Sequence, residues 1–147
     1  MKYIFYILPL FAGVFVTIQA GVNTQLRTSI DNPIGAAFIS FLGGTLVLAL
    51  ALMLFKQPLP TLQTLSTVAW YKYTGGLLGA TFVTIAILSA PKIGVSNMAV
   101  LIIAGQLITA VYFDHLGFMG FKVNEITLTK LLGLLSVVLG AYLINKK

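Results

Sequence analysis

Three polar side chains recur every four residues in an otherwise apolar stretch near the N-terminus. Gln19, Asn23 and Arg27 end this stretch, and at 3.6 residues per turn they share one face of a helix. Carboxamides carry hydrogen-bond donors and an acceptor. An unsatisfied polar group is costly in lipid, so this face should point into protein or a water-filled cavity. We interpret Gln19 and Asn23 as substrate-binding residues and Arg27 as an interfacial anchor.

A second polar group lies in the C-terminal half. Gln106 interrupts an apolar run, and we interpret it as a third substrate-binding residue. For Gln19 and Gln106 alike, the alternative is a structural hydrogen bond between helices, worth about 1 kcal/mol or less in lipid. Asp114 and His115 end the run. This pair could relay a proton or gate a pathway, or it could close the helix by binding its last carbonyl groups.

The residues needed for other chemistry are scarce. The chain has one His, three acidic residues and no Cys, which excludes thiol catalysis and a disulfide framework and leaves little for a metal site. No Ser/His/Asp spacing indicates a triad. The Gly-rich runs lack the Gly-Lys-Ser/Thr of a phosphate-binding loop. We therefore expect that the protein is not an enzyme and uses no metal or other cofactor.

The elements that position these residues are membrane spans. Of the 147 residues, 59% are hydrophobic and only 8% are charged, whereas roughly a quarter are charged in soluble domains. The sequence predicts an all-α, polytopic membrane protein in which residues 1–147 form a single bundle of five transmembrane helices. Five apolar segments reach the about 17–20 residues that cross a bilayer, namely 3–26, 33–55, 73–90, 93–113 and 126–144.

Local signals separate the spans. Asp31 or Asn32 can cap the second span, with Pro33 at its first helical position, and two prolines within residues 56–60 stop it. Residues 90–94 predict a tight turn, after which Ser96 or Asn97 could cap the next helix.

The two longer connections have different characters. The threonine-rich stretch Thr61–Thr67 predicts an interfacial loop, followed by an aromatic belt at Trp70, Tyr71 and Tyr73. Gly117 and Gly120 allow the last connection to turn back.

The distribution of basic residues hardly favours either orientation of the chain in the membrane. The net charge of +6 is scattered one or two residues per connection, which does not suit a nucleic-acid partner. An odd number of spans places the two termini on opposite sides of the membrane. The N-terminal side then carries five basic residues, Lys2, Lys56, Lys72, Lys122 and Lys130. The other side carries four, Arg27, Lys92, Lys146 and Lys147, and the positive-inside rule depends on this difference. This balance favours either dual topology with antiparallel pairing, or a fixed orientation that a partner subunit imposes.

Depth supports the antiparallel alternative. We take the midpoint between the charged residues that flank each span as the middle of the membrane, and count 1.5 Å per residue from it. Gln19 then lies ~7 Å beyond the middle and Gln106 ~5 Å beyond it in the opposite direction, so the two differ by ~12 Å in depth. An inverted second copy would bring the two amides level. Rows of small residues such as Ala36–Ser40–Gly44 and Ser136–Gly140 predict close helix contacts, one of which could serve a subunit interface.

Three motifs resemble a known family. Gln19-Ala-Gly-Val-Asn23-Thr-Gln-Leu26, Ser40-Phe-Leu-Gly-Gly44, and Ala104-Gly-Gln-Leu107 leading to Asp114-His115-Leu-Gly117 resemble the YdcZ-type inner-membrane exporters of the drug/metabolite transporter superfamily. The resemblance covers essentially the whole chain. It implies a bacterial inner-membrane exporter built from units that pair as inverted halves. The small multidrug resistance relatives carry a Glu in helix one, whereas the first span here has no acidic residue.

Together these features predict a multi-pass protein of the bacterial inner membrane that exports a small organic molecule by alternating access in a dimer. We expect its partners to be a small-molecule substrate, membrane lipid, and either an antiparallel second copy or a related subunit. The alternative is a non-transporting accessory or assembly subunit. In that case Gln19 and Gln106 would be satisfied within one chain.

Overall fold

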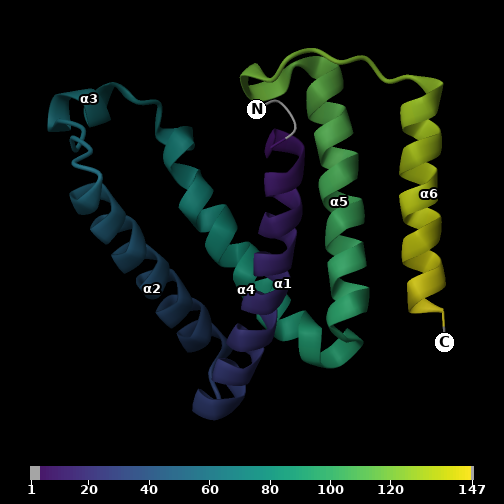
Figure 1. Cartoon of the computed structure of the whole chain (residues 1–147), viewed down its shortest axis with the longest axis horizontal. Coiled ribbons are helices and arrows are strands. Elements are labelled where there is room, and N and C mark those ends of the chain that lie inside the picture. The colour runs from purple at the N-terminus through teal and green to yellow at the C-terminus, as the bar shows by residue number, and fades with distance from the viewer. Residues whose placement is uncertain (1–3, 147) are drawn as a thin grey trace. The chain divides into compact units, whose positions relative to one another are not determined.

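Long helices dominate the computed structural model, which describes residues 4–146 (Figure 1). Within that part of the chain, five helices are long and apolar enough to cross a membrane, which confirms the predicted fold class. They are α1 (Ile4–Ile30), α2 (Pro33–Leu54), α4 (Gly75–Ile93), α5 (Val95–Leu116) and α6 (Leu128–Asn145). The predicted start of the first span at residue 3 lies outside the described residues, as do Lys2 and Lys147.

The second span begins and ends where its sequence signals predicted. Asn32 is the N-cap of α2, with its side-chain oxygen accepting a hydrogen bond from the Gly35 N–H at 2.9 Å, and Pro33 occupies the first turn. The helix ends at Leu54, ahead of the proline-containing stretch. The helix that contains the first predicted span, α1, continues to Ile30.

Two local predictions were wrong. The stretch predicted as a loop forms a short helix, α3 (Leu62–Thr67), because the Thr61 hydroxyl caps it by accepting from the Thr64 N–H at 3.1 Å. The turn predicted over residues 90–94 is reduced to one residue. Helix α4 continues through Pro91, and Gly94 adopts a φ of 84° and caps α5 without a side-chain bond. Glycine tolerates that φ, so neither Ser96 nor Asn97 is needed as a cap.

The chain divides into two compact units, residues 1–92 and 93–147, and each is described by itself. The first contains α1, α2, α3, the 3-10 helix η1 (Trp70–Thr74) and α4; the second contains α5, the 3-10 helix η2 (Phe118–Gly120) and α6. The prediction of a single bundle over residues 1–147 stays a prediction.

The core of the first unit depends on small side chains. Ala36 and Ala37 of α2 are buried against Val83 and Ile87 of α4, and Leu26 of α1 packs on this cluster. A Cβ at Gly79 would lie 3.3 Å from Cζ of Phe41, so the phenyl ring sits directly on the α4 backbone. Van der Waals contacts between side chains, as here, stabilise helix association in lipid.

In the second unit, α5 and α6 pack along most of their length. Residues spaced three or four apart are shielded on each helix, as expected for helices that face each other. On α5 they are Ala104, Leu107 and Val111, and on α6 they are Leu134, Val137 and Ala141.

The connection between α5 and α6 turns through left-handed positions. Gly117 has a φ of 62° and Gly120 a φ of 85°, which confirms that these glycines reverse the chain. The carbonyl of Asp114 accepts from the Asn124 N–H at 2.8 Å. The Lys130 ammonium donates to the carbonyls of Asn124 at 2.8 Å and Glu125 at 2.7 Å. These bonds fold the connection back onto the ends of both helices.

Candidate functional site

Gln19 and Gln106 lie deep in apolar helices, yet both are exposed. Gln19 is two residues from the middle of α1 and Gln106 is at the middle of α5. Each glutamine therefore lies close to the middle of its own helix, and the difference in depth predicted from the flanking charges stays a prediction.

Asn23 is placed differently from the two glutamines. Only 4% of its surface is exposed, and its Nδ2 makes no hydrogen bond to any group of the described chain. Ala20, one turn earlier, is buried as well. A buried amide donor without a partner is costly, on the order of 1–3 kcal/mol. In this arrangement of the helices, Nδ2 is a buried donor whose hydrogen-bonding capacity is unused.

Hydroxyl groups in the same helices are satisfied locally. Thr17 and Thr24 of α1 donate to the carbonyls of Gly13 at 3.0 Å and Ala20 at 2.7 Å. Thr84 of α4 and Thr109 of α5 bond to their own helices in the same way, at 2.8 and 3.0 Å. This contrast singles out the carboxamides, because within residues 4–146 no bond from the Gln19 or Gln106 side chain to its own unit is found.

Asp114 and His115 lie in the last turn of α5, outside the apolar middle. His115 Nδ1 accepts from the Ile126 N–H at 3.4 Å, so the imidazole contacts the returning connection. The main-chain carbonyl of Asp114 accepts from the Asn124 N–H at 2.8 Å, and the Lys130 ammonium binds the carbonyls of Asn124 and Glu125 rather than the Asp114 carboxylate. Both residues therefore take part in closing the α5–α6 turn. Among residues 4–146, no three potential metal-ligating side chains of His, Cys, Asp or Glu cluster together.

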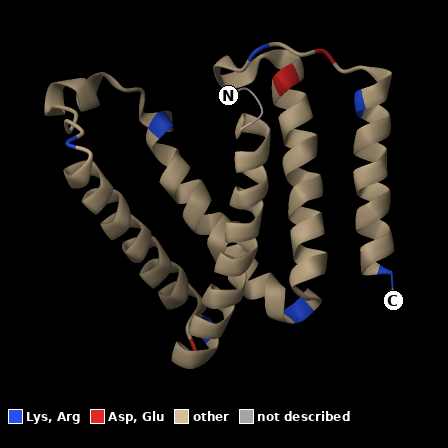
Figure 2. Cartoon of the chain, in the orientation of Figure 1, with Lys and Arg blue, Asp and Glu red and all other residues tan. Residues whose placement is uncertain are grey.

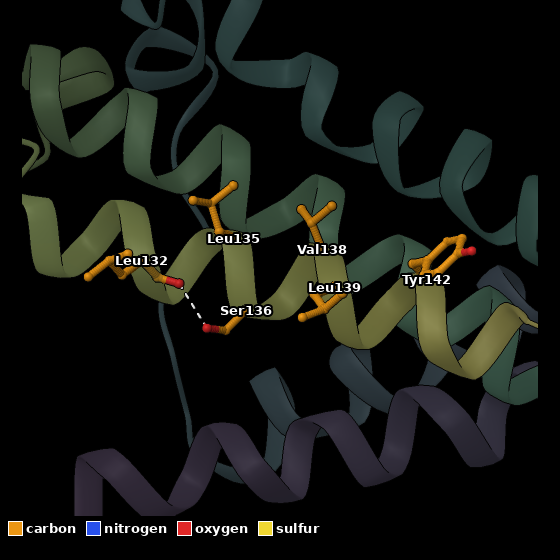
Figure 3. A pocket seen from close by; sticks show the side chains of 6 residues that line it. All are labelled: Leu132, Leu135, Ser136, Val138, Leu139 and Tyr142. Atoms are coloured by element: carbon orange, nitrogen blue, oxygen red, sulfur yellow. Dashed lines mark hydrogen bonds between the residues drawn. The ribbon is translucent and has the colours of Figure 1, made fainter.

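A shallow apolar groove runs along the outer face of α6 (Figure 3). Its volume is about 610 Å³, and it is lined by Leu132, Leu135, Ser136, Val138, Leu139 and Tyr142. These residues lie on a different face from Leu134, Val137 and Ala141, which pack toward α5. The Ser136 hydroxyl donates to the Leu132 carbonyl at 2.9 Å, and the Tyr142 hydroxyl is the other polar side-chain group of this mainly apolar lining. Only the Ser136–Gly140 spacing pointed to this face in the sequence.

Comparison with known proteins decides the family. A family model described as "Putative inner membrane exporter, YdcZ" matches residues 4–143. The chain belongs to this family. It is also 24% identical over 137 residues to "Inner membrane protein YdcZ" of Escherichia coli (strain K12), with 92% of this chain and 91% of that protein covered. No solved structure matches the chain.

Membership of the YdcZ family, together with five spanning helices, makes the chain a multi-pass bacterial inner-membrane protein and a membrane transporter. The match includes both units and all three carboxamides. In this transporter, Gln19 and Asn23 share α1 in the first unit, whereas Gln106 belongs to the second.

Proposed function

We propose that the chain exports a small organic molecule by alternating access, with Gln19, Asn23 and Gln106 in the pathway. The observation that carries this proposal is the state of the three amides. They lie in apolar helices, and among residues 4–146 neither the glutamine amides nor the Asn23 Nδ2 has a hydrogen-bond partner in its own unit, while neighbouring hydroxyls are satisfied. Polar groups inside membrane spans generally mark substrate pathways.

The uncharged amides of the pathway and the aromatic content of the chain, 12% Phe, Trp and Tyr, favour neutral or cationic amphipathic substrates, because aromatic rings attract cations. A carboxamide can bind a carbonyl, hydroxyl or ammonium group equally well. We propose that the substrate crosses chemically unchanged, because the three amides provide hydrogen bonds and no nucleophile or acid–base pair.

We further propose that two copies associate in antiparallel orientation through the α6 groove. The nearly equal counts of basic residues on the two sides allow either orientation. The groove is apolar, and no element of the second unit fills it. Ser136 has a small side chain, which lets a second helix approach α6 closely.

Cysteine accessibility tests the pathway without knowledge of the substrate. The chain has no Cys, so Gln19→Cys and Gln106→Cys report single positions. In intact cells, we expect both to react with a charged, water-soluble thiol reagent at least tenfold faster than Val14→Cys and Leu101→Cys. Each control is exposed on the same helix, five residues earlier and therefore about 140° around it. Equal, slow reaction at all four positions would contradict an aqueous pathway.

Topology labelling tests the antiparallel dimer. Single cysteines at Thr64, in α3, and at Asn145, at the end of α6, lie on opposite sides of the membrane if the five helices all span it. With an impermeant reagent and intact cells, we expect each to label at about half its level in lysed cells. Full labelling at one position and none at the other would rule out inverted copies of this chain.

The same two experiments separate the alternative function. A non-transporting accessory subunit would have Gln19 and Gln106 satisfied within one chain, with no accessible cavity. Cysteines at the two positions would then be unreactive, and a subunit held by a partner would show a single orientation. The exposure of both glutamines in their own units supports the transport proposal.

A further inference from the structure

The connection from α2 to α4, residues 55–74, exposes apolar and aromatic side chains outside the spanning helices. Leu62 is 85% exposed and Trp70 is 78% exposed, and Leu59 and Tyr71 are more than half exposed. Contact between these apolar side chains and water is unfavourable, so they would be more stable in an apolar environment. Aromatic side chains with a polar edge are enriched at membrane–water interfaces.

The connection is folded, so it cannot extend far from the helix ends that hold it. The Leu65 carbonyl accepts from both the Val68 N–H at 3.1 Å and the Tyr73 hydroxyl at 2.7 Å. These bonds tie α3 to the residues that follow it and to η1; Figure 1 shows the course of the connection between α2 and α4. Because α2 ends at Leu54 and α4 starts at Gly75, two consecutive spans in α2 and α4 would hold both attachment points at one surface of the membrane.

Its hydroxyl groups are satisfied within the segment. The Thr61 and Thr64 hydroxyls bond to each other at 2.9 Å. Ser66 and Thr67 donate to the carbonyls of Gln63 and Thr64, both at 2.8 Å. A segment that has already paired these groups loses little when water around it is replaced by lipid headgroups.

Its charge is wholly basic. Lys56 and Lys72 are the charged residues between positions 55 and 74, and Figure 2 shows basic but no acidic colouring along this connection. The bacterial inner membrane presents phosphate headgroups on both faces. Basic residues near a membrane surface are attracted to anionic lipid.

We propose that residues 55–74 form a membrane-surface anchor that lies in the headgroup layer and binds anionic phospholipid through Lys56 and Lys72. Leu59, Leu62 and Trp70 enter the outer edge of the acyl region, while the two ammonium groups contact phosphate. This anchor is independent of the export pathway and of the direction in which the chain inserts, since either surface provides headgroups.

Trp70 is the single tryptophan of the chain, so its fluorescence tests the anchor directly. The full chain would be reconstituted in phosphatidylcholine vesicles with and without phosphatidylglycerol. Lipids brominated near the headgroup end of the acyl chain, lipids brominated near its methyl end, and aqueous iodide would serve as quenchers. We expect the shallow bromines to quench at least twice as strongly as the deep ones, with iodide quenching well below that of free tryptophan. Phosphatidylglycerol should reduce iodide access further.

A variant carrying Lys56→Gln and Lys72→Gln separates the two parts of the proposal. It should keep shallow quenching but lose the response to phosphatidylglycerol, whereas Lys122→Gln, in the other connection, should keep both. Strong iodide quenching would place the segment in water. Absence of quenching by every agent would mean that protein covers Trp70. Insensitivity of the wild-type chain to phosphatidylglycerol would remove the role of the lysines. Each of these results would overturn the anchor and would leave the proposed export pathway untouched.

Discussion

Asn23→Ala is expected to reduce export about tenfold while leaving the stability of the protein within about 1 kcal/mol of the wild type. The amide is buried and its Nδ2 is unpartnered, so its removal breaks no hydrogen bond of the folded chain. Loss of one hydrogen bond to a bound substrate costs about 1–3 kcal/mol, and 1.4 kcal/mol is a factor of ten. Extrusion of an amphipathic cation such as ethidium and thermal unfolding in detergent would measure the two effects.

Asn32→Ala provides the matched control, with the opposite pattern. Asn32 is exposed, but its side chain caps α2 at 2.9 Å from the Gly35 nitrogen. Its loss should cost about 1 kcal/mol of stability and leave export unchanged per folded molecule. If Asn23→Ala instead unfolds the protein while export per folded molecule is retained, Asn23 is a packing residue and the pathway must be drawn without it.

Gly117→Ala is expected to destabilise the second unit by about 3 kcal/mol, the largest effect on stability predicted here. The residue has a φ of 62°, and a Cβ there would lie 2.7 Å from Cγ2 of Val123. The left-handed conformation costs an alanine about 1 kcal/mol. The enforced shift of Val123 adds an overpacking cost of roughly 1–3 kcal/mol. Thermal unfolding in detergent and protease cleavage of the α5–α6 connection would report the loss.

Gly120→Ala separates the two contributions. Its φ is 85°, but no atom lies within 4 Å of a Cβ at that position, so only the conformational cost of about 1 kcal/mol applies. Adding Val123→Ala to Gly117→Ala should recover the difference, because Val123 is itself 59% exposed and its truncation is cheap. Equal destabilisation by Gly117→Ala and Gly120→Ala would show that the Val123 contact does not matter.

The spanning helices could be predicted from sequence because length and hydropathy alone set them. The ends were predicted well where a side chain fixes them, as at Asn32 and at the prolines after Leu54. They were predicted poorly where the backbone does, as at Gly94. Pro91 suggested that the helix ends before it, but α4 accommodates this proline in its final turn. Helix α3 was missed because its single threonine cap resembles ordinary loop composition.

The spacing of the candidate site residues could not predict which of them are buried. Gln19 and Asn23 fall on one face of α1, but only Asn23 is buried. Which of them is covered depends on where neighbouring helices pass, and that is decided by contacts distant in sequence, such as Ala36 and Ala37 with Val83 and Ile87. The polarity of the site was therefore predictable, whereas its burial was not.

The hydroxyls bonded back to their own helices have a consequence for motion. Thr24, Thr84 and Thr109 complete their hydrogen bonds within a single helix, and the α2–α4 core consists of aliphatic contacts. A helix of this kind can slide or rotate against its neighbour without breaking any directional bond between them. The energetic cost of such a shift is then the cost of repacking alanine, valine and isoleucine side chains. For the alternating access that we propose, such helix surfaces would let one packing arrangement exchange for another without the loss of hydrogen bonds between helices.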